Sequence, residues 1–306
     1  MVLDKPLGTF SIQEFAVPDP APGTVLLRME LSGCCATDAH TYLGQWKNAA
    51  FPALLGHENV GVVEAVGPEV TDLQPGDQVF GSRSGAFAEY VSTKNVVRMP
   101  AGLSFEEAAS LPVAGFTALQ AVRDKAEVRP GQRVLVNGAG GGVGSLVVQI
   151  AKAHGAEVTG VTSTGNLELV ASLGADRVVD YTRDDFTRGR DRYDVIFDAG
   201  GNRSLARLRR VLAPSGTLVM IAPGAGQWVG PLVRIVGAML ISRFSDQRLR
   251  PFLSSVSRDD LVVLRDMVEA GKLRPVIDRT FAYEQIPDAI RYVESGASHG
   301  KVVITI

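Results

Sequence analysis

The chain has 306 residues, 45% hydrophobic and 21% charged, which is typical of a globular protein with one large or two ordinary domains. Its net charge of -2 excludes an electrostatic attraction to nucleic acid or an anionic membrane, and prolines, glycines and an arginine interrupt the apolar stretch 217–241 that would have to span a bilayer. Two adjacent cysteines, Cys34 and Cys35, exclude a disulfide framework, and without a recognisable signal peptide we expect a cytoplasmic protein.

Short strands separated by turn residues predict a small β domain over residues 1 to 100. Each of these segments is rich in valine, leucine or an aromatic residue and is bounded by glycine, proline or aspartate. The predicted strands are 24–31, 60–66, 78–80, 87–91 and 96–97. So many short strands in succession are typical of a small barrel-like domain.

The pattern changes at Ser104, where Ser104 and Glu107 form a capping box ahead of an alanine-rich helix. Strands and helices then alternate. The predicted strands are 133–136, 157–161, 177–179, 194–197 and 217–221, and the predicted helices are 145–154, 166–173 and 205–212. This alternation indicates an α/β fold with a doubly wound, mostly parallel sheet.

The tail is mixed, with helices expected over 259–270 and 287–294 and a strand over 301–306. We expect this tail to return and complete the first domain. The predicted division is therefore a discontinuous domain of residues 1–107 and 250–306, and a dinucleotide-binding domain of residues 108–249.

The glycine loop 138–144 is the strongest functional signal. It joins an apolar strand to a helix, so backbone N–H groups and the positive end of the helix can approach a pyrophosphate. A flexible glycine linker would not need both flanks, and the loop therefore predicts a dinucleotide site.

The segment 162–166 (Thr-Ser-Thr-Gly-Asn) indicates which dinucleotide is bound. An NAD enzyme usually places a carboxylate about 20 residues after the glycine loop, to hold the adenosine ribose. Here the segment carries hydroxyl and amide groups, among them Ser163 and Thr164, which can bind a 2′-phosphate. The sequence therefore favours NADP(H), although no lysine or arginine lies in this segment and NAD(H) stays open.

These motifs, together with Leu111–Thr117, Leu173–Asp176, Val179–Tyr181 and Gly300–Ile304, resemble the medium-chain dehydrogenase/reductase superfamily. The second half is most similar to its zinc-free quinone-reductase branch, which includes relatives of the mitochondrial reticulon-4-interacting protein. The resemblance implies a GroES-like β-barrel catalytic domain interrupted in sequence by a Rossmann domain. It also implies that Gly142, Val143, Ser163 and Tyr181 contact NADPH, with Tyr181 near the 2′-phosphate, although many relatives have arginine where this chain has Gly165. The predicted cofactor-binding residues are Gly138, Gly140, Gly141, Gly142, Val143, Gly144, Ser163, Thr164, Tyr181 and Lys301.

The N-terminal segment resembles instead the zinc alcohol dehydrogenases, through Cys35 and the Gly-His-Glu triplet at 56–58. The resemblance implies zinc ligands at Cys35 and His57, with Thr37 and His40 relaying the proton of an alcohol. Catalytic zinc needs three protein ligands, and the family's usual third ligand is replaced by Val113. Glu58 is a candidate substitute. The four-cysteine structural-zinc lobe is missing, so the sequence favours an enzyme without zinc and leaves zinc open.

The favoured function is an NADPH-dependent reductase of quinones or α,β-unsaturated carbonyls. Charge developing on the substrate oxygen needs a donor. The resemblance implies that Thr37, His40 and Tyr42 are the polar groups nearest this oxygen, and they are the predicted catalytic residues. One alternative is a zinc-dependent alcohol dehydrogenase or aldehyde reductase, and another is a non-catalytic NADP(H)-binding sensor or interaction protein. Trp228, Leu232, Ile235 and Phe244 suggest a small apolar substrate. The resemblance also implies a homodimer, since the last Rossmann strand of such enzymes often pairs with its twin, and the candidate strand is 240–244.

Overall fold

A computed structural model describes residues 1–45, 49–221 and 229–306, and for 229–232 the backbone only. The chain divides into two compact units. One, here the antiparallel unit, contains Met1–Phe116, Val256–Ala270 and Pro275–Ile306. The other, the Rossmann unit, contains Thr117–Ser255 and Gly271–Arg274. The unit boundaries thus fall after residues 116 and 255, where the sequence suggested 107 and 249.

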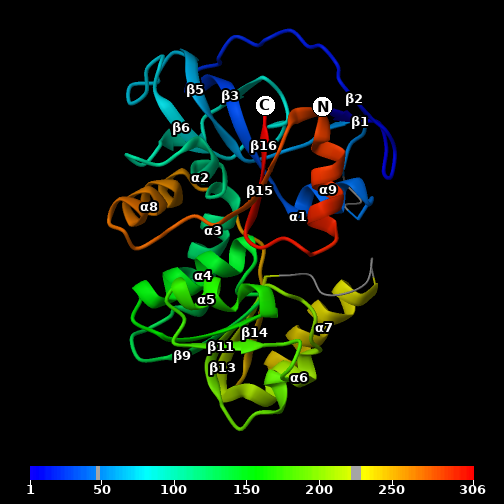
Figure 1. Ribbon diagram of the computed structural model, residues 1–306, viewed down its shortest axis with the longest axis vertical. Coiled ribbons are helices and arrows are strands. Elements are labelled where there is room, and N and C mark those ends of the chain that lie inside the picture. Colours follow the sequence, from blue (N-terminus) through cyan, green and yellow to red (C-terminus); the bar gives the residue numbers. More distant parts are fainter. Residues whose placement is uncertain (46–48, 222–228) are drawn as a thin grey trace. The chain divides into compact units, whose positions relative to one another are not determined.

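The antiparallel unit is built around the ten-residue strand β3 (Val25–Cys34). In its main sheet β3 lies between β16 (Lys301–Thr305) and β5 (Asn59–Val66), and the strand order is β15-β16-β3-β5-β6-β8, with β7 also paired to β3. The tail therefore returns to this unit as expected, because β16 supplies one neighbour of the central strand. Figure 1 shows β16 in red beside β3 in blue.

The other elements of this unit are short. Its further strands are β1 (Val2–Leu3), β2 (Phe10–Ser11), β4 (Ala53–Leu54), β6 (Gln78–Gly81), β7 (Tyr90–Thr93), β8 (Val96–Arg98) and β15 (Ile277–Phe281). Its helices are α1 (Ala36–Tyr42), α2 (Phe105–Ala109), α8 (Arg258–Glu269) and α9 (Ile286–Glu294), and α3 (Pro112–Gln120) crosses the boundary. The predicted capping box begins α2: Glu107 N donates to Ser104 Oγ, and Ser104 N donates to the Glu107 carboxylate.

The Rossmann unit contains a six-stranded parallel sheet in the order β11-β10-β9-β12-β13-β14. Helices α4 and α5 pack on one face of this sheet, and α6 and α7 on the other (Figure 1). The strands are β9 (Arg133–Asn137), β10 (Glu157–Thr162), β11 (Arg177–Asp180), β12 (Tyr193–Asp198), β13 (Leu212–Met220) and β14 (Arg248–Pro251); the helices are α4 (Gly142–Ala153), α5 (Leu167–Ser172), α6 (Leu205–Val211) and α7 (Val229–Phe244). The predicted doubly wound α/β fold is confirmed.

The order of the strands in this sheet indicates where a ligand can bind. Strand order reverses between β9 and β12, since the chain winds outward from β9 in one direction and from β12 in the other. In open parallel sheets, ligands bind at the carboxyl ends of the strands beside such a reversal. The glycine loop follows β9 and therefore lies at this position.

The prediction of a strand over 240–244 is wrong, because these residues form the end of helix α7. Buried or half-buried side chains recur at Arg234, Ala238, Ile241 and Ser245, every three or four residues. This spacing is that of a helix face rather than of a strand. Trp228 and the side chain of Leu232, which suggested an apolar substrate, lie outside the described residues. None of the helices in the described part of the chain is long and apolar enough to cross a membrane.

Candidate cofactor and reaction sites

The glycine loop has the geometry expected for a dinucleotide. Gly138 follows β9 with φ of +86°, a conformation that residues with a side chain rarely adopt. A Cβ on Gly144 would lie 2.0 Å from the Gly138 carbonyl oxygen, so only glycine lets the first turn of α4 pack against the loop. A Cβ on Gly141, in contrast, would meet no atom closer than 3.5 Å. The outer side of the loop is therefore open for a ligand.

The start of α4 supplies the positive end of this site. Gly141 is its N-cap residue, and the first amides of a helix have no intrahelical acceptor. These amides and the helix dipole favour a pyrophosphate, so the loop fits a dinucleotide.

A buried carboxylate next to the loop was not predicted. Asp198 ends β12 and is fully buried. Its Oδ1 accepts from Asn137 Nδ2 at 2.7 Å and from Gly201 N at 3.0 Å, and Oδ2 pairs with the guanidinium of Arg234 on α7. The ends of β9 and β12 are thus tied together and to α7. An aspartate directly after an apolar strand was the available sequence signal.

Thr164 makes contacts that the sequence could not show. Its hydroxyl donates to Asp180 Oδ2 at 2.6 Å, whereas the hydroxyl of Ser163 has no hydrogen-bond partner among the described residues. Tyr181, whose side chain is exposed, follows Asp180 directly. The hydroxyl of Thr164 is therefore committed to a protein acceptor.

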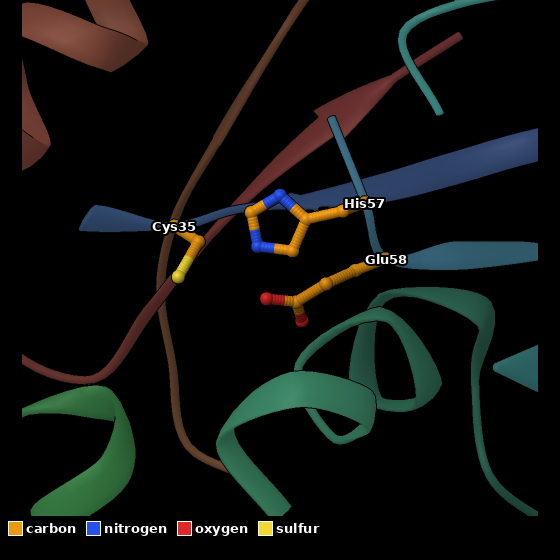
Figure 2. Close-up of side chains that lie close together, drawn as sticks. All are labelled: Cys35, His57 and Glu58. Carbon is orange, nitrogen blue, oxygen red and sulfur yellow. The ribbon is translucent and has the colours of Figure 1, made fainter. Parts of the chain in front are cut away.

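In the antiparallel unit, three potential metal ligands converge at the end of β3. Cys35 follows β3, and His57 and Glu58 precede β5, its neighbour in the sheet. One sulfur, one ring nitrogen and one carboxylate oxygen all lie within 4.8 Å of one another. Figure 2 shows these side chains pointing toward a common centre. The residues predicted as candidate ligands are thus brought together.

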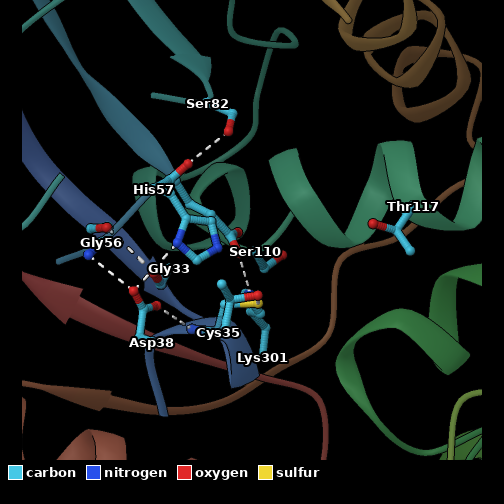
Figure 3. A network of polar contacts seen from close by, with 12 residues as sticks. Gly33, Cys35, Asp38, Gly56, His57, Ser82, Ser110, Thr117 and Lys301 are labelled. Atoms are coloured by element: carbon cyan, nitrogen blue, oxygen red, sulfur yellow. Dashed lines mark hydrogen bonds and ion pairs between the residues drawn. The ribbon is translucent and has the colours of Figure 1, made fainter. Parts of the chain in front are cut away.

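Asp38 on α1 holds this cluster in place (Figure 3). Its Oδ2 accepts from Cys35 N at 2.9 Å, and its Oδ1 accepts from Gly56 N at 3.0 Å and lies 3.3 Å from His57 Nδ1. Burial alone would lower the pKa of His57, but the Asp38 carboxylate outweighs it and raises the pKa well above the usual range. Contact with Nδ1 leaves Nε2 of the ring free to face Cys35 and Glu58.

Lys301 is the fourth member of the cluster. In the antiparallel register Val302 lies opposite Cys34, so Lys301, the first residue of β16, comes beside Cys35. Its buried ammonium group pairs with Glu58 Oε1. Burial would lower the pKa of Lys301, but the Glu58 carboxylate raises it above its usual value. The ammonium is therefore charged, and the predicted contact of Lys301 with the cofactor stays a prediction.

The three predicted catalytic residues differ in their surroundings. Thr37 is exposed, and its hydroxyl lies 3.7 Å from Cys35 Sγ. His40 Nδ1 is bound to the Gln45 side chain. Tyr42 stacks on Phe10, with ring centroids 5.7 Å apart, and packs against the apolar core. Of the three, the structure places Thr37 beside the cluster.

Comparison with known proteins decides the family. The family of alcohol dehydrogenase GroES-like domains matches residues 21–101, and the zinc-binding dehydrogenase family matches residues 173–304. A 2-methylene-furan-3-one reductase from Solanum lycopersicum is 36% identical over 94% of this chain and 73% of its own length. The chain belongs to the medium-chain dehydrogenase/reductase superfamily.

Two further proteins that are similar to this chain support the same family. The NADPH-dependent alkenal/one oxidoreductase of Arabidopsis thaliana, a chloroplastic protein, is 34% identical over 94% of this chain and 73% of its own length. The crystal structure of the quinone oxidoreductase from Coxiella burnetii has a TM-score of 0.85 at 26% identity, covering 100% of this chain and 98% of the other. The predicted family, the GroES-like and Rossmann fold, and an NAD(P)H-dependent oxidoreductase are confirmed.

The cluster also fits a metal ion in the number and type of its donors. Zinc in catalytic sites has three protein ligands and one open position, and a thiolate, an imidazole and a carboxylate are ligands of the required kinds. Glu58 Oε2 is buried and has no hydrogen-bond partner among the described residues. Lys301 competes for the other carboxylate oxygen and places a positive charge in the cluster.

Proposed function

We propose that this oxidoreductase uses NADPH to reduce the carbon–carbon double bond of an α,β-unsaturated carbonyl compound, or a quinone, of small size and apolar character. The names of the two plant reductases and of the quinone oxidoreductase support this substrate class. The glycine loop supports the cofactor, since it offers helix amides to a pyrophosphate.

The ion pair between Lys301 and Glu58 is the observation that favours a reaction without zinc. Glu58 is fully buried and would need a positive partner in any case. The Lys301 ammonium supplies that positive charge, and the charges of Asp38 and His57 compensate one another. The buried charges are thus compensated by side chains of the chain itself.

Bound NADPH supplies hydride to the β-carbon of the substrate. The residues of the chain would bind and orient the cofactor: the loop 138–144 would hold the pyrophosphate, and Ser163 and Tyr181 would contact the phosphorylated ribose. We assign to the exposed Thr37 hydroxyl the hydrogen bond to the substrate carbonyl oxygen, where negative charge develops. Water delivers the proton to the α-carbon.

The test is a substrate panel. The purified protein is given NADPH or NADH with a quinone, an enone, an enal and a saturated aldehyde, and the products are identified by mass spectrometry. We expect saturated ketones and aldehydes from the enone and enal, and faster turnover with NADPH. Tight binding of NADPH without turnover of any of these compounds would favour the non-catalytic sensor instead.

A zinc-dependent alcohol dehydrogenase or aldehyde reductase is the second candidate, because three donor atoms lie within 4.8 Å. Zinc held by Cys35, His57 and Glu58 would polarise a carbonyl oxygen. Metal analysis separates the two candidates. One zinc per chain, lost together with activity in Cys35→Ser, would contradict the zinc-free proposal.

We further propose a cytoplasmic homodimer. Both cysteines are free thiols, which suits a reducing compartment. Helix α7 exposes one apolar face formed by Val233, Val236, Leu240 and Phe244, and the Phe244 side chain is 85% exposed. An apolar face of this kind is typical of a contact between proteins. Light scattering of the purified protein should give the mass of a dimer, and a monomer would refute this proposal.

A further inference from the structure

Asp180 is the last residue of β11, which lies at one edge of the parallel sheet of the Rossmann unit. In the parallel register Thr162 of β10 lies opposite Asp180, so the segment after Thr162 and the turn after Asp180 emerge side by side. The first of these segments contains Ser163, Thr164 and Gly165. This edge of the sheet is therefore where the ribose of the cofactor is expected.

The Asp180 carboxylate is held by hydroxyl groups. Oδ2 accepts from Thr164 Oγ1 at 2.6 Å, and Oδ1 accepts from Thr182 Oγ1 at 2.7 Å and from Thr182 N at 2.9 Å. The Thr164 and Thr182 hydroxyls lower the pKa of Asp180, so the group is ionised at neutral pH. A 2′-phosphate at this edge would meet a negative charge and would need a cation to offset it.

Arg183 supplies a cation at this position. Its Nε lies 3.6 Å from Asp180 Oδ2, the same oxygen that accepts from Thr164. The Arg183 side chain is 74% exposed, so most of its guanidinium faces solvent. A single carboxylate oxygen thus brings the guanidinium beside the segment expected to contact the ribose.

The segment 162–166 (Thr-Ser-Thr-Gly-Asn) has no lysine or arginine of its own. A guanidinium presents several donors in a plane, which suits the oxygens of a phosphate. We infer that Arg183, in the turn that follows β11, binds the 2′-phosphate of NADP(H) and supplies the cation that the segment 162–166 lacks. This inference rests on the proposed function, in which NADPH is the cofactor.

The test is the affinity of the intact protein for NADPH and NADH, measured by isothermal titration calorimetry. We expect Arg183→Ala to weaken NADPH about tenfold, the value of one exposed charge-assisted contact, and to leave NADH unchanged. Arg183→Lys should retain part of the affinity for NADPH. Added KCl should weaken NADPH binding to the wild type more steeply than to Arg183→Ala.

Arg188→Ala is the matched control. Arg188 has a 77% exposed side chain and pairs with Asp185 three residues before it, as Arg183 pairs with Asp180. The Arg188→Ala variant should bind NADPH and NADH with the affinities of the wild type. If the wild type prefers NADPH and Arg183→Ala keeps that preference, the inference is overturned while the proposed cofactor stands. If the wild type binds NADH as tightly as NADPH, the proposed cofactor and the inference both fail.

Discussion

Lys301→Met removes the positive partner of Glu58 and leaves the side-chain volume nearly unchanged. The Glu58 carboxylate is fully buried, and one of its oxygens already has no partner among the described residues. Breaking a buried ion pair on one side costs about 3–5 kcal/mol, because the remaining charge is left without compensation. We therefore expect the free energy of unfolding to fall by an amount of this size.

The assay is urea unfolding followed by circular dichroism, on Lys301→Met, Glu58→Gln and the double variant. If the two side chains stabilise one another, the double variant should lose less than the sum of the single variants, by about 2–3 kcal/mol. Losses that simply add would refute a direct ion pair. Zinc content is measured for each variant, since a metal ion that replaces the ammonium could also hold Glu58.

Three further predictions concern the loop, a helix cap and metal. Gly144→Ala should cost about 1–3 kcal/mol of stability and weaken NADPH binding, because its Cβ would lie 2.0 Å from the Gly138 carbonyl oxygen. Gly141→Ala should weaken NADPH binding in calorimetry, yet the variant should unfold at the same urea concentration as the wild type. Ser104→Ala should cost about 1 kcal/mol in urea unfolding by removing the acceptor for Glu107 N, and no loss would argue against the cap. Treatment with a chelator should leave enone reduction unchanged, and its abolition, with recovery on adding zinc, would contradict the zinc-free proposal.

Much of the fold could be predicted from the sequence because local patterns and tertiary structure agree. Gly271 and Gly296 follow α8 and α9 with positive φ, the conformation in which a glycine commonly ends a helix. Helix α7 was misjudged at its end, since Leu240–Phe244 is a short, mostly apolar run that suits a strand as well as a helix. Only its packing on the sheet, with Ala238 buried and Leu240 exposed, separates the two.

The glycine loop could be predicted for the same reason, since strand, glycines and helix are contiguous. The reaction cluster is harder, because Lys301 and Glu58 are 243 residues apart and meet only through the strand register. Whether Thr164 is free to bind a phosphate was also beyond the sequence. Its hydroxyl is engaged by Asp180, which belongs to a neighbouring strand.

The destination of the transferred hydride tests the central claim most directly. The zinc-free protein is incubated with an enone and NADPH that carries deuterium at the transferable position, and the product is examined by NMR. We predict a saturated ketone with deuterium on the carbon β to the carbonyl. Deuterium on the carbonyl carbon, in a reaction that proceeds only after zinc is added, would contradict the account.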